Sequence, residues 1–500
     1  MPPLPIHEVL PQIKSALSAH TSVVLQAPPG AGKTTIVPPE LLNEPWLGGR
    51  SILILEPRRL AARAAAARMA DLMNEKVGET VGFRIRFESK VTARTRIEVL
   101  TEGILTRRLQ SDPGLEGVGL VIFDEFHERH LHGDLALALC IDARRQLCHD
   151  LKILIMSATL EGEAISAVLN KAPVITSEGR LHPVDIRYEK NDPEDRVPET
   201  VKRAVIRALE ADRGDVLVFL PGAWEIRRTR ELLEKTSAAA VDLLPLYGDL
   251  PWEAQQKAIA PSNGGKRKVV LATPIAETSL TIDGVGVVID SGFVRVPRFD
   301  PGSGLSRLVT TRISRGSADQ RAGRAGRLGP GVCYRLWSRT THSGLISHPI
   351  PEIRSADLTS LVLELAQWGV PDAETLSWLD PPPESALSNA RRLLIQLGAV
   401  NSEGGITPIG KSMARMPLHP RLSHMVIEAE ALGAGFLAAD LAALLSERDP
   451  LGSKRRVSCD IVDRLEALGG FRKRGAPGAR SFGADPAACK RVDQAARQIG

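Results

Sequence analysis

Residues 22–35 read Ser-Val-Val-Leu-Gln-Ala-Pro-Pro-Gly-Ala-Gly-Lys-Thr-Thr, an apolar run followed by a glycine-rich turn. The run from Val23 to Ala27 is typical of a buried strand, and the residues after the turn are expected to open a helix. Backbone amides in such a turn, and at the start of such a helix, point at phosphate oxygens. The stretch therefore predicts a phosphate-binding loop, with a chance match as the alternative.

The residues of this loop that are predicted to bind a nucleotide are Gly30, Ala31, Gly32, Lys33, Thr34 and Thr35. Lys33 can reach the β and γ phosphates, and the Thr34 hydroxyl can hold Mg²⁺. The position usually held by the first glycine of such loops is Ala27 here.

The composition indicates a globular protein of several domains. The chain has 500 residues, of which 43% are hydrophobic, and this excludes a disordered or collagen-like chain. Its net charge of +5 permits a polyanionic partner. No apolar run approaches the roughly 20 residues of a membrane span, and the N-terminus lacks a signal-peptide pattern. The five cysteines form no CxxC pair. We expect a soluble, cytoplasmic protein with reduced thiols and no membrane partner.

Short β-branched runs alternate with longer helical stretches in the first part of the chain, which predicts parallel strands joined by helices. In a first α/β unit, residues 1–180, further strands are expected at Ser51–Leu55, Arg96–Leu100, Leu120–Asp124 and Lys152–Met156, and a helix at Leu60–Met73. In a second unit, residues 181–339, strands are expected at Asp215–Leu220, Lys268–Ala272, Val285–Asp290 and Val332–Trp337. The proline-containing segment His182–Pro198 is expected to be a connection.

Helical patterns dominate after Ser338, for example at Leu358–Trp368 and Leu387–Leu397. Gly404 and Gly405 are expected to turn a short wing between extended pieces. A basic, glycine-rich loop is expected to interrupt the last helical stretch at Gly469–Gly483.

Two adjacent acids end the apolar run that precedes them, in Leu120-Val-Ile-Phe-Asp-Glu-Phe-His-Glu-Arg129. Carboxylates at the ends of parallel strands lie where such a sheet binds its ligands. Asp124 is predicted to bind the Mg²⁺ shell, and Glu125 to polarise the attacking water. A solvated acid pair in a turn is the alternative, and His127 is either a coupling residue or a structural histidine.

A third motif, Gln320-Arg-Ala-Gly-Arg-Ala-Gly-Arg327, ends the second unit. Phosphoryl transfer needs cations at the equatorial oxygens, and Arg324 and Arg327 are expected to share a helix face and to supply them across a cleft. A basic surface helix that binds a phosphate backbone is the alternative.

In these three motifs the chain resembles the DEAH-box helicases of superfamily 2, and most of all their bacterial HrpB type. Further motifs that carry the resemblance are Glu56-Pro-Arg-Arg59, Thr101-Glu-Gly103, Ser157-Ala-Thr159, Phe219-Leu-Pro-Gly222 and Thr273-Pro-Ile-Ala-Glu-Thr-Ser-Leu-Thr-Ile-Asp283. The fold that the resemblance implies is α/β, with two tandem RecA-like parallel-sheet domains followed by winged-helix and helical-bundle domains. The last two would be residues 340–415 and 416–500, and the bundle is expected to be incomplete.

The resemblance also implies roles for single residues. Lys33, Asp124, Glu125, Gln320, Arg324 and Arg327 would be catalytic, with Gln320 placing the water together with Glu125. Arg68 and Asp283 would contact the nucleotide, and His127, Ser157, Thr159 and Thr281 would couple hydrolysis to movement. Arg59, Arg86, Thr101 and Thr273 would contact the sugar-phosphate backbone of a single strand.

Phe293–Ile313 resembles a strand-separating hairpin, for which a plain surface hairpin is the alternative. Two positions depart from the family pattern. Pro274 stands where many relatives carry Asn, which puts one nucleic-acid contact in doubt. Ile259 stands where relatives often have a Phe that stacks on adenine, which predicts weak discrimination between nucleotide bases.

The resemblance thus implies an ATP-driven motor that uses ATP and Mg²⁺ and moves along single-stranded RNA. Three alternatives stay open. They are a DNA helicase of the same mechanism, a non-catalytic nucleotide-gated scaffold that binds nucleic acid, and a P-loop kinase or transporter ATPase.

Overall fold

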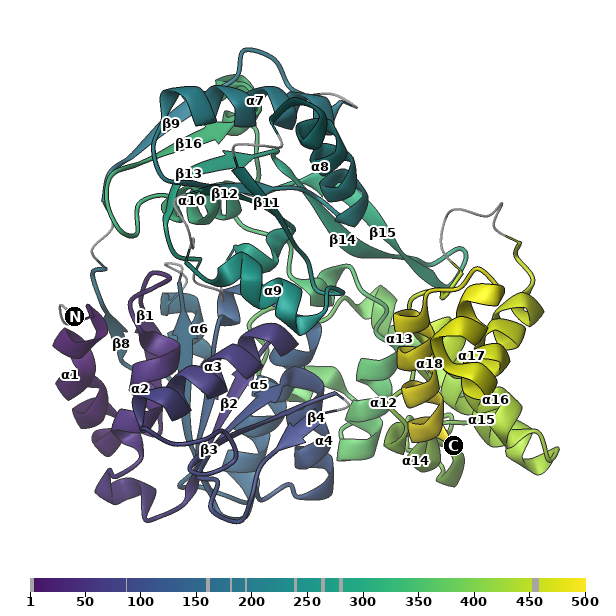
Figure 1. Ribbon diagram of the computed structural model, residues 1–500. Coiled ribbons are helices and arrows are strands. Elements are labelled where there is room, and N and C mark those ends of the chain that lie inside the picture. The colour runs from purple at the N-terminus through teal and green to yellow at the C-terminus, as the bar shows by residue number, and fades with distance from the viewer. Residues whose placement is uncertain are drawn as a thin grey trace. The chain divides into compact units, whose positions relative to one another are not determined.

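The structure is a computed structural model that describes residues 4–86, 88–158, 162–179, 182–193, 196–237, 241–261, 266–277, 282–451 and 458–500 (Figure 1). Its contacts divide the chain into two compact units. The N-terminal unit comprises Met1–Ala356 and Ser377–Asp380, and the C-terminal unit comprises Asp357–Leu376 and Pro381–Gly500.

The first lobe of the N-terminal unit is built on a sheet with the strand order β4-β3-β5-β2-β6-β7-β1-β8. All neighbours are parallel except β3 and β4. The strands are β1 (Ser22–Gln26), β2 (Ser51–Glu56), β3 (Val81–Ile85), β4 (Glu88–Lys90), β5 (Ile97–Thr101), β6 (Val118–Phe123), β7 (Lys152–Ser157) and β8 (Val174–Thr176). Every residue of β1, β6 and β7 is buried, which explains their continuous apolar sequences.

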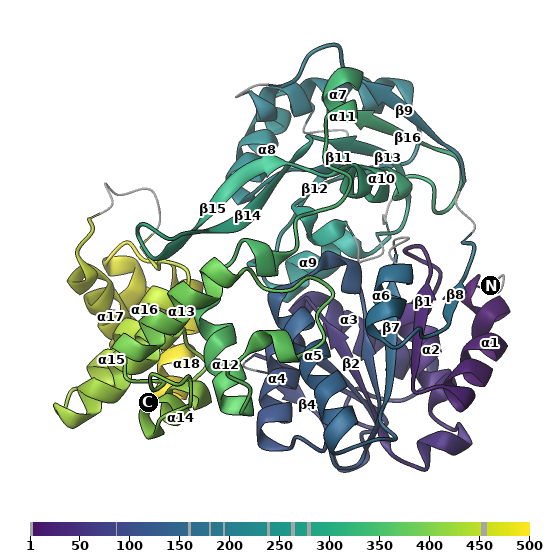
Figure 2. The same ribbon diagram turned by 180° about the vertical axis from the view of Figure 1, so that it is seen from behind.

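The helices of the first lobe cover both faces of this sheet (Figure 2). They are α1 (Ile6–Ala19), α2 (Lys33–Leu41), α3 (Arg59–Leu72), α4 (Glu102–Ser111), α5 (Leu131–Gln146) and α6 (Gly162–Val168), with the short turns η1 (Pro45–Leu47) and η2 (Phe126–Glu128). Val23 and Leu25 belong to the core that α1, α2 and α3 form with the sheet. The predicted first unit is therefore present, and β3, β4 and β8 are strands that the sequence analysis did not assign.

The second lobe is built on a fully parallel sheet with the order β11-β12-β10-β13-β16-β9. Its strands are β9 (Val184–Tyr188), β10 (Asp215–Phe219), β11 (Val241–Leu246), β12 (Arg267–Ala272), β13 (Val285–Asp290) and β16 (Gly331–Arg335). Its helices are α7 (Val197–Ala211), α8 (Ala223–Ser237), α9 (Trp252–Ile259), α10 (Arg315–Gly323) and α11 (Arg339–Ser343), with the short turn η3 (Pro274–Ala276). Farther along the chain, the short turn η4 (Glu352–Arg354) contacts α5 of the first lobe.

The prediction that His182–Pro198 is only a connection is wrong, because this segment contains β9. Within the described residues this strand pairs with β16 alone, at the edge of the sheet, and Asp185 and Arg187 on it are exposed. An edge strand buries one face at most, so every second residue can be charged. Because the strand prediction relied on continuous apolar runs, it missed this strand.

An antiparallel hairpin of β14 (Phe293–Asp300) and β15 (Leu305–Arg312) projects from the second lobe. The Gly304 amide donates to the Asp300 carbonyl at 2.9 Å, and Gly304 has a φ of 66°, which favours glycine. The hairpin expected from the sequence is therefore present at Phe293–Ile313.

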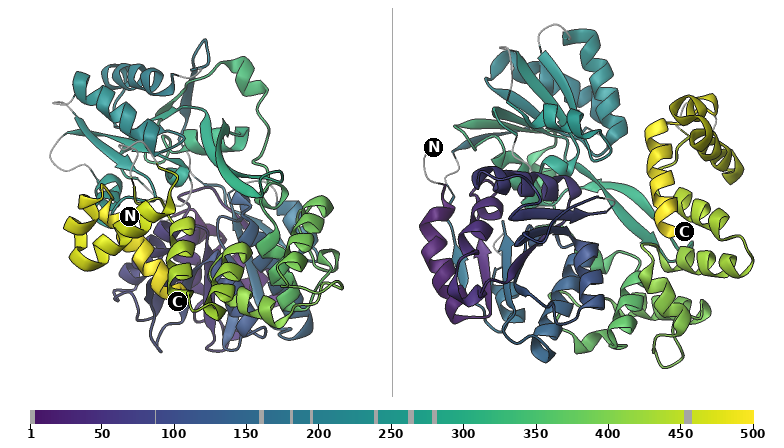
Figure 3. Two further views of the ribbon diagram at one scale, coloured as in Figure 1. Left: turned by 90° about the vertical axis from the view of Figure 1, so that its right-hand side faces the viewer. Right: turned by 60° about the horizontal axis from the view of Figure 1, so that its bottom comes forward.

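The C-terminal unit is helical (Figure 3). Its helices are α12 (Thr359–Trp368), α13 (Glu384–Gln396), α14 (Pro408–Arg415), α15 (Pro420–Ala431), α16 (Gly435–Ser446), α17 (Ile461–Ser481) and α18 (Pro486–Ile499), with η5 (Ala373–Thr375). An antiparallel bridge joins Val400 to Ile406 around Gly404, which has a φ of 86°, and this is the predicted wing. Within the described ranges no helix combines the length and the apolar character needed to cross a membrane.

The glycine-rich loop predicted at Gly469–Gly483 is wrong for most of its length, because α17 runs through it with one break at Gly475. A Cβ atom on Gly478 would lie 2.0 Å from the Gly470 carbonyl oxygen. These two glycines therefore let two helical segments pack backbone against backbone, instead of forming a loop. The basic cluster Lys454-Arg-Arg456 lies outside the described residues.

Candidate functional site

The predicted phosphate loop connects β1 to α2, and the first helical residue is Lys33. Gly30 and Gly32 have φ angles of 87° and 95°, a region that L side chains rarely adopt. Gly32 is the N-cap residue of α2, and no side chain caps this helix. The amides of the first turn therefore have no side-chain cap, an arrangement that can bind an anion.

The acid pair lies at the carboxyl end of β6, beside the loop. The Thr34 hydroxyl donates a hydrogen bond to Asp124, and Lys33 Nζ donates to Glu125 Oε1 at 3.0 Å. The Glu125 amide donates to Asp124 Oδ1 at 2.8 Å. Asp124 and Glu125 are each 4% exposed. Two motifs that are 90 residues apart in sequence thus form one buried polar cluster.

Burial and neighbouring charges set the ionisation of this cluster. Burial, and then the charge of Glu125, raises the pKa of Asp124 to about 6. Burial is again the largest influence and by itself would raise the pKa of Glu125, but the charge and hydrogen bond of Lys33, together with the neighbouring His127, lower the pKa below its usual value. Glu125 Oε2 has no hydrogen-bond partner among the described residues. An ionised carboxylate oxygen is therefore available to a polar ligand.

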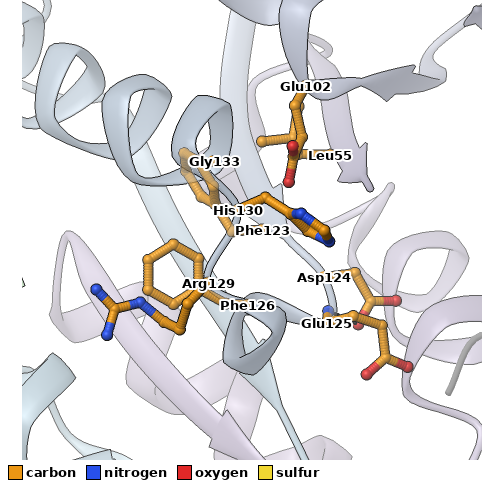
Figure 4. A pocket seen from close by; sticks show the side chains of 9 residues that line it. All are labelled: Leu55, Glu102, Phe123, Asp124, Glu125, Phe126, Arg129, His130 and Gly133. Atoms are coloured by element: carbon orange, nitrogen blue, oxygen red, sulfur yellow. Dashed lines mark hydrogen bonds between the residues drawn. The ribbon is translucent and has the colours of Figure 1, made fainter. Parts of the chain in front are cut away.

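A small cavity lies next to the acid pair (Figure 4). Its lining residues are Leu55, Glu102, Phe123, Asp124, Glu125, Phe126, Arg129, His130 and Gly133. Burial raises the pKa of Glu102 to about 7. Glu56, at the end of β2, is a further buried carboxylate near Asp124 and is 1% exposed. Burial together with the charge of Asp124 raises the pKa of Glu56 well above its usual value.

His127 connects the acid pair to the end of β7. Its Nδ1 accepts a hydrogen bond from the Ala158 amide at 3.3 Å and lies 3.5 Å from Glu125 Oε2. Burial lowers the pKa of His127, so the ring is neutral and Nδ1 is the acceptor. His127 Nδ1 and Glu125 Oε2 therefore lie close together without a hydrogen bond between them. Ser157, fully buried, precedes Ala158, whereas Thr159 lies outside the described residues.

Arg327 of the second lobe reaches the phosphate loop, and Arg324 lies near the acid pair. A Cβ atom on Gly30 would lie 3.6 Å from the guanidinium carbon of Arg327. Arg324 Nε donates to the Glu277 carbonyl at 2.8 Å. Burial lowers the pKa of Arg327 to about 10 and that of Arg324 well below its usual value, and the charge of Glu125 partly opposes both shifts. Guanidinium groups and acids thus converge from the two lobes.

The prediction that Arg324 and Arg327 share a helix face is wrong, because α10 ends at Gly323. Arg324 is the C-cap residue, and Arg327 lies in the bend that follows. Arg321, which the sequence analysis did not select, anchors the helix. Its guanidinium group is 1% exposed and pairs with Glu277 and Asp290, each at 2.8 Å.

Gln320 is half-buried on α10 and makes no direct hydrogen bond with Glu125 in the described part of the chain. Arg68 is exposed on α3, and Asp283 is exposed but close enough for its charge to act on Arg327. Ile259 is half-buried at the end of α9, and Thr281 lies outside the described residues.

The predicted nucleic-acid contacts lie at the ends of elements. Arg59 is exposed at the start of α3, Arg86 follows β3, and Thr101 ends β5. Thr273 follows β12 of the second lobe. Arg58, which the sequence analysis did not single out, donates to Glu128 at 3.0 Å and to the Pro274 carbonyl at 2.7 Å.

Comparison with known proteins identifies the domains. Residues 8–168 match the DEAD/DEAH box helicase family, residues 198–329 the helicase conserved C-terminal domain, and residues 390–418 the winged-helix helicase associated domain, HA2. The crystal structure of the Escherichia coli DEAH/RHA helicase HrpB matches with a TM-score of 0.87 and 44% identity, over 99% of this chain and 60% of that chain. This confirms the predicted fold class of tandem RecA-like parallel-sheet domains with a helical C-terminal region.

Two of the relatives are named as ATP-dependent RNA helicases. The chain is 48% identical to "ATP-dependent RNA helicase HrpB" of Escherichia coli (strain K12), over 91% of this chain and 56% of that protein. It is 38% identical to "Pre-mRNA-splicing factor ATP-dependent RNA helicase prp22" of Schizosaccharomyces pombe, over 93% of this chain and 40% of that protein. The chain therefore spans about half the length of these relatives. With its acid pair, phosphate loop and converging arginines, the chain belongs to the DEAD/DEAH-box helicases and is similar to HrpB.

Proposed function

We propose that the protein is an ATP-dependent helicase that hydrolyses ATP to move along single-stranded RNA and to unwind or remodel it. The observation that carries this proposal is the meeting of Arg327 from the second lobe with Gly30 of the phosphate loop, next to Glu125. Phosphoryl transfer requires both an acid site and cations that stabilise the developing charge. The relatives named as RNA helicases support RNA as the strand.

In this proposal the triphosphate of ATP lies against the amides of Gly30–Thr35, and Lys33 moves from Glu125 to the phosphates. Arg68 and Asp283 contact the rest of the nucleotide. The residues also fit Mg²⁺, because the Thr34 hydroxyl and the Asp124 carboxylate are adjacent oxygen donors of the kind that this ion prefers. When bound, the ion would offset negative charge on the phosphates.

Glu125 is the proposed base that orients and polarises the attacking water, together with Gln320. Its lowered pKa keeps it ionised, and its Oε2 atom is available to a water molecule. Arg324 and Arg327 stabilise the charge that develops on the transferred group.

His127, Ser157, Thr159 and Thr281 are proposed to couple hydrolysis to movement. The hydrogen bond from Ala158 to His127 gives this coupling a direct path to the end of β7. Arg59, Arg86, Thr101 and Thr273 contact the strand backbone, and the β14–β15 hairpin separates strands. The functional domains are proposed to be residues 1–180, 181–339, 340–415 and 416–500.

The test is ATP turnover by the wild type and three variants, with and without single-stranded RNA. Lys33→Ala is expected to lose turnover and nucleotide binding. Glu125→Gln is expected to lose about 100-fold or more of kcat while it still binds nucleotide, because only the proton acceptor is removed. Lys14→Ala, which breaks a surface ion pair with Glu40, is the matched lysine control and keeps wild-type turnover.

Unchanged hydrolysis by Glu125→Gln contradicts the catalytic assignment and favours a nucleotide-gated scaffold. Single-stranded DNA of the same length as the RNA is run in parallel. Stronger stimulation by DNA than by RNA reassigns the strand, because the expected contacts are to the backbone and do not by themselves distinguish the two.

A further inference from the structure

The loop that follows the acid pair is held in an unusual backbone conformation. Glu125 and Arg129, at the two ends of the turn Phe126–Glu128, have φ angles of 48° and 52°. Residues with a Cβ atom rarely adopt this left-handed region, so surrounding contacts must maintain it. The contacts of Arg129 therefore help to maintain the loop that begins at Glu125.

Arg129 is 6% exposed, and its guanidinium group makes three hydrogen bonds to carboxylates among the described residues. Its Nε and Nη2 donate to the two carboxylate oxygens of Asp134 at 3.2 and 3.1 Å, and its Nη1 donates to Asp380 at 2.7 Å. Figure 4 shows that the guanidinium group points away from the carboxylates of Asp124 and Glu125. Arg129 is therefore not a catalytic residue, and it can act only through the position of the loop.

A second segment holds the backbone of the same loop. The Glu352 amide donates to the Arg129 carbonyl at 3.0 Å, and Glu352 Oε2 accepts from the Leu131 amide at 2.9 Å. Arg354 also pairs with Asp380, at 2.6 Å. Asp380 thus joins the loop of the acid pair to the segment that contains Glu352.

These holding residues lie where the backbone passes between the two units. Asp380 is the last residue of the N-terminal unit before Pro381, and Glu352 lies four positions before Ala356, where the chain first leaves that unit. The contacts described above are all within the N-terminal unit. A strain at either junction would therefore act on the loop that carries Glu125.

We propose that Arg129 is a positioning residue that keeps Glu125 in the orientation needed for hydrolysis. In the same proposal, Asp380 makes the position of Arg129 depend on the C-terminal unit. Strain that reaches either junction from the C-terminal unit would in this way adjust ATP hydrolysis. The inference rests on the proposed ATPase function and adds its regulation.

Three aspartate variants of the full chain test the proposal by ATP turnover with and without single-stranded RNA. Asp380→Ala removes the carboxylate, Asp380→Glu keeps it, and Asp212→Ala removes a matched partner of Arg187 in the second lobe. We expect Asp380→Ala to lower the RNA-stimulated kcat about tenfold with the KM for ATP within about threefold, since the loss affects the transition state and not nucleotide binding. Asp380→Glu is expected to recover most of kcat, and Asp212→Ala to keep the wild-type ratio of stimulated to basal turnover.

Hydrogen exchange of the amides of residues 125–131 in the nucleotide-free protein is a readout that needs no hydrolysis. Asp380→Ala should speed exchange there and Asp212→Ala should not. The proposal is overturned if exchange and kcat are unchanged in Asp380→Ala, or if Asp380→Glu fails to recover them. If the wild type does not hydrolyse ATP, the proposed function fails, while the exchange result still decides whether Asp380 holds the loop.

Discussion

The guanidinium group of Arg58 donates a 2.7 Å hydrogen bond to the backbone carbonyl of Pro274. Arg58 belongs to the first lobe and Pro274 to the second, so this bond joins the lobes. Proline has lost the side-chain amide and the backbone donor that the family pattern supplies at this position, but it keeps its carbonyl. Pro274, although it departs from the family pattern, therefore still offers a carbonyl oxygen that accepts a hydrogen bond from Arg58 of the first lobe.

Arg58→Ala is expected to lower RNA-stimulated ATP turnover about tenfold. The side chain also donates to Glu128 at 3.0 Å, so its loss removes two hydrogen bonds from a charged donor, each worth about 1.5–3 kcal/mol. Steady-state kinetics with saturating RNA measure the effect. Arg84→Ala is the control, because it breaks a pair between the exposed Arg84 and the buried Glu98 within the same lobe. Equal losses in both variants would contradict a role specific to the lobe contact.

Gly30→Ala is expected to weaken ATP binding at least about tenfold. Gly30 has a φ of 87°, and an added Cβ would lie 3.6 Å from the guanidinium group of Arg327, in the space that the phosphates are proposed to use. The dissociation constant of a fluorescent ATP analogue measures the change. Gly103→Ala is the matched control, because this glycine lies in α4 and its Cβ would meet open space. Similar affinity in the two variants would remove Gly30 from the site.

The stability of the nucleotide-free protein is expected to fall as the pH rises from 4.5 to 7. Burial raises the pKa of Glu102 from 4.5 to about 7, so within this window the folded protein holds a proton that the unfolded chain has released. The carboxyl group therefore contributes stability at low pH that is lost as the pH passes through 7, at most about 3 kcal/mol.

Urea unfolding from pH 4.5 to 8 measures this dependence. Glu102→Gln, which resembles the protonated acid, should reduce it, whereas Glu116→Gln on the exposed surface should leave the wild-type profile. Parallel profiles for the wild type and Glu102→Gln would show that the carboxyl group titrates normally.

ATP and GTP are expected to be hydrolysed with kcat/KM values within about tenfold of each other, a transition-state difference below about 1.4 kcal/mol. Ile259 offers no aromatic face on which a purine could stack. Ile259→Phe should increase the preference for ATP, and Ile395→Phe in the C-terminal unit should not. A wild-type preference well above tenfold would mean that other residues read the base.

Much of the fold follows from the sequence, because buried parallel strands are continuous apolar runs between turn residues. β1, β2, β6 and β7 begin or end within two residues of their predicted bounds. β9 was missed for the opposite reason, since an edge strand with exposed Asp185 and Arg187 has no such run. The glycines of α17 were misread because their role is close packing between Gly470 and Gly478, which sequence spacing does not reveal.

The groups expected at the site can be predicted from the sequence alone, because a phosphate loop, strand-end acids and an arginine motif are local patterns with local physical reasons. Which of these groups lie in contact depends on the packing of distant segments. In the folded protein Arg327 lies against Gly30, Lys33 donates a hydrogen bond to Glu125, and α10 ends before Arg324. The same packing also places Asp380 on Arg129, 251 residues away, because a buried guanidinium group must find its carboxylates wherever the packed chain brings them.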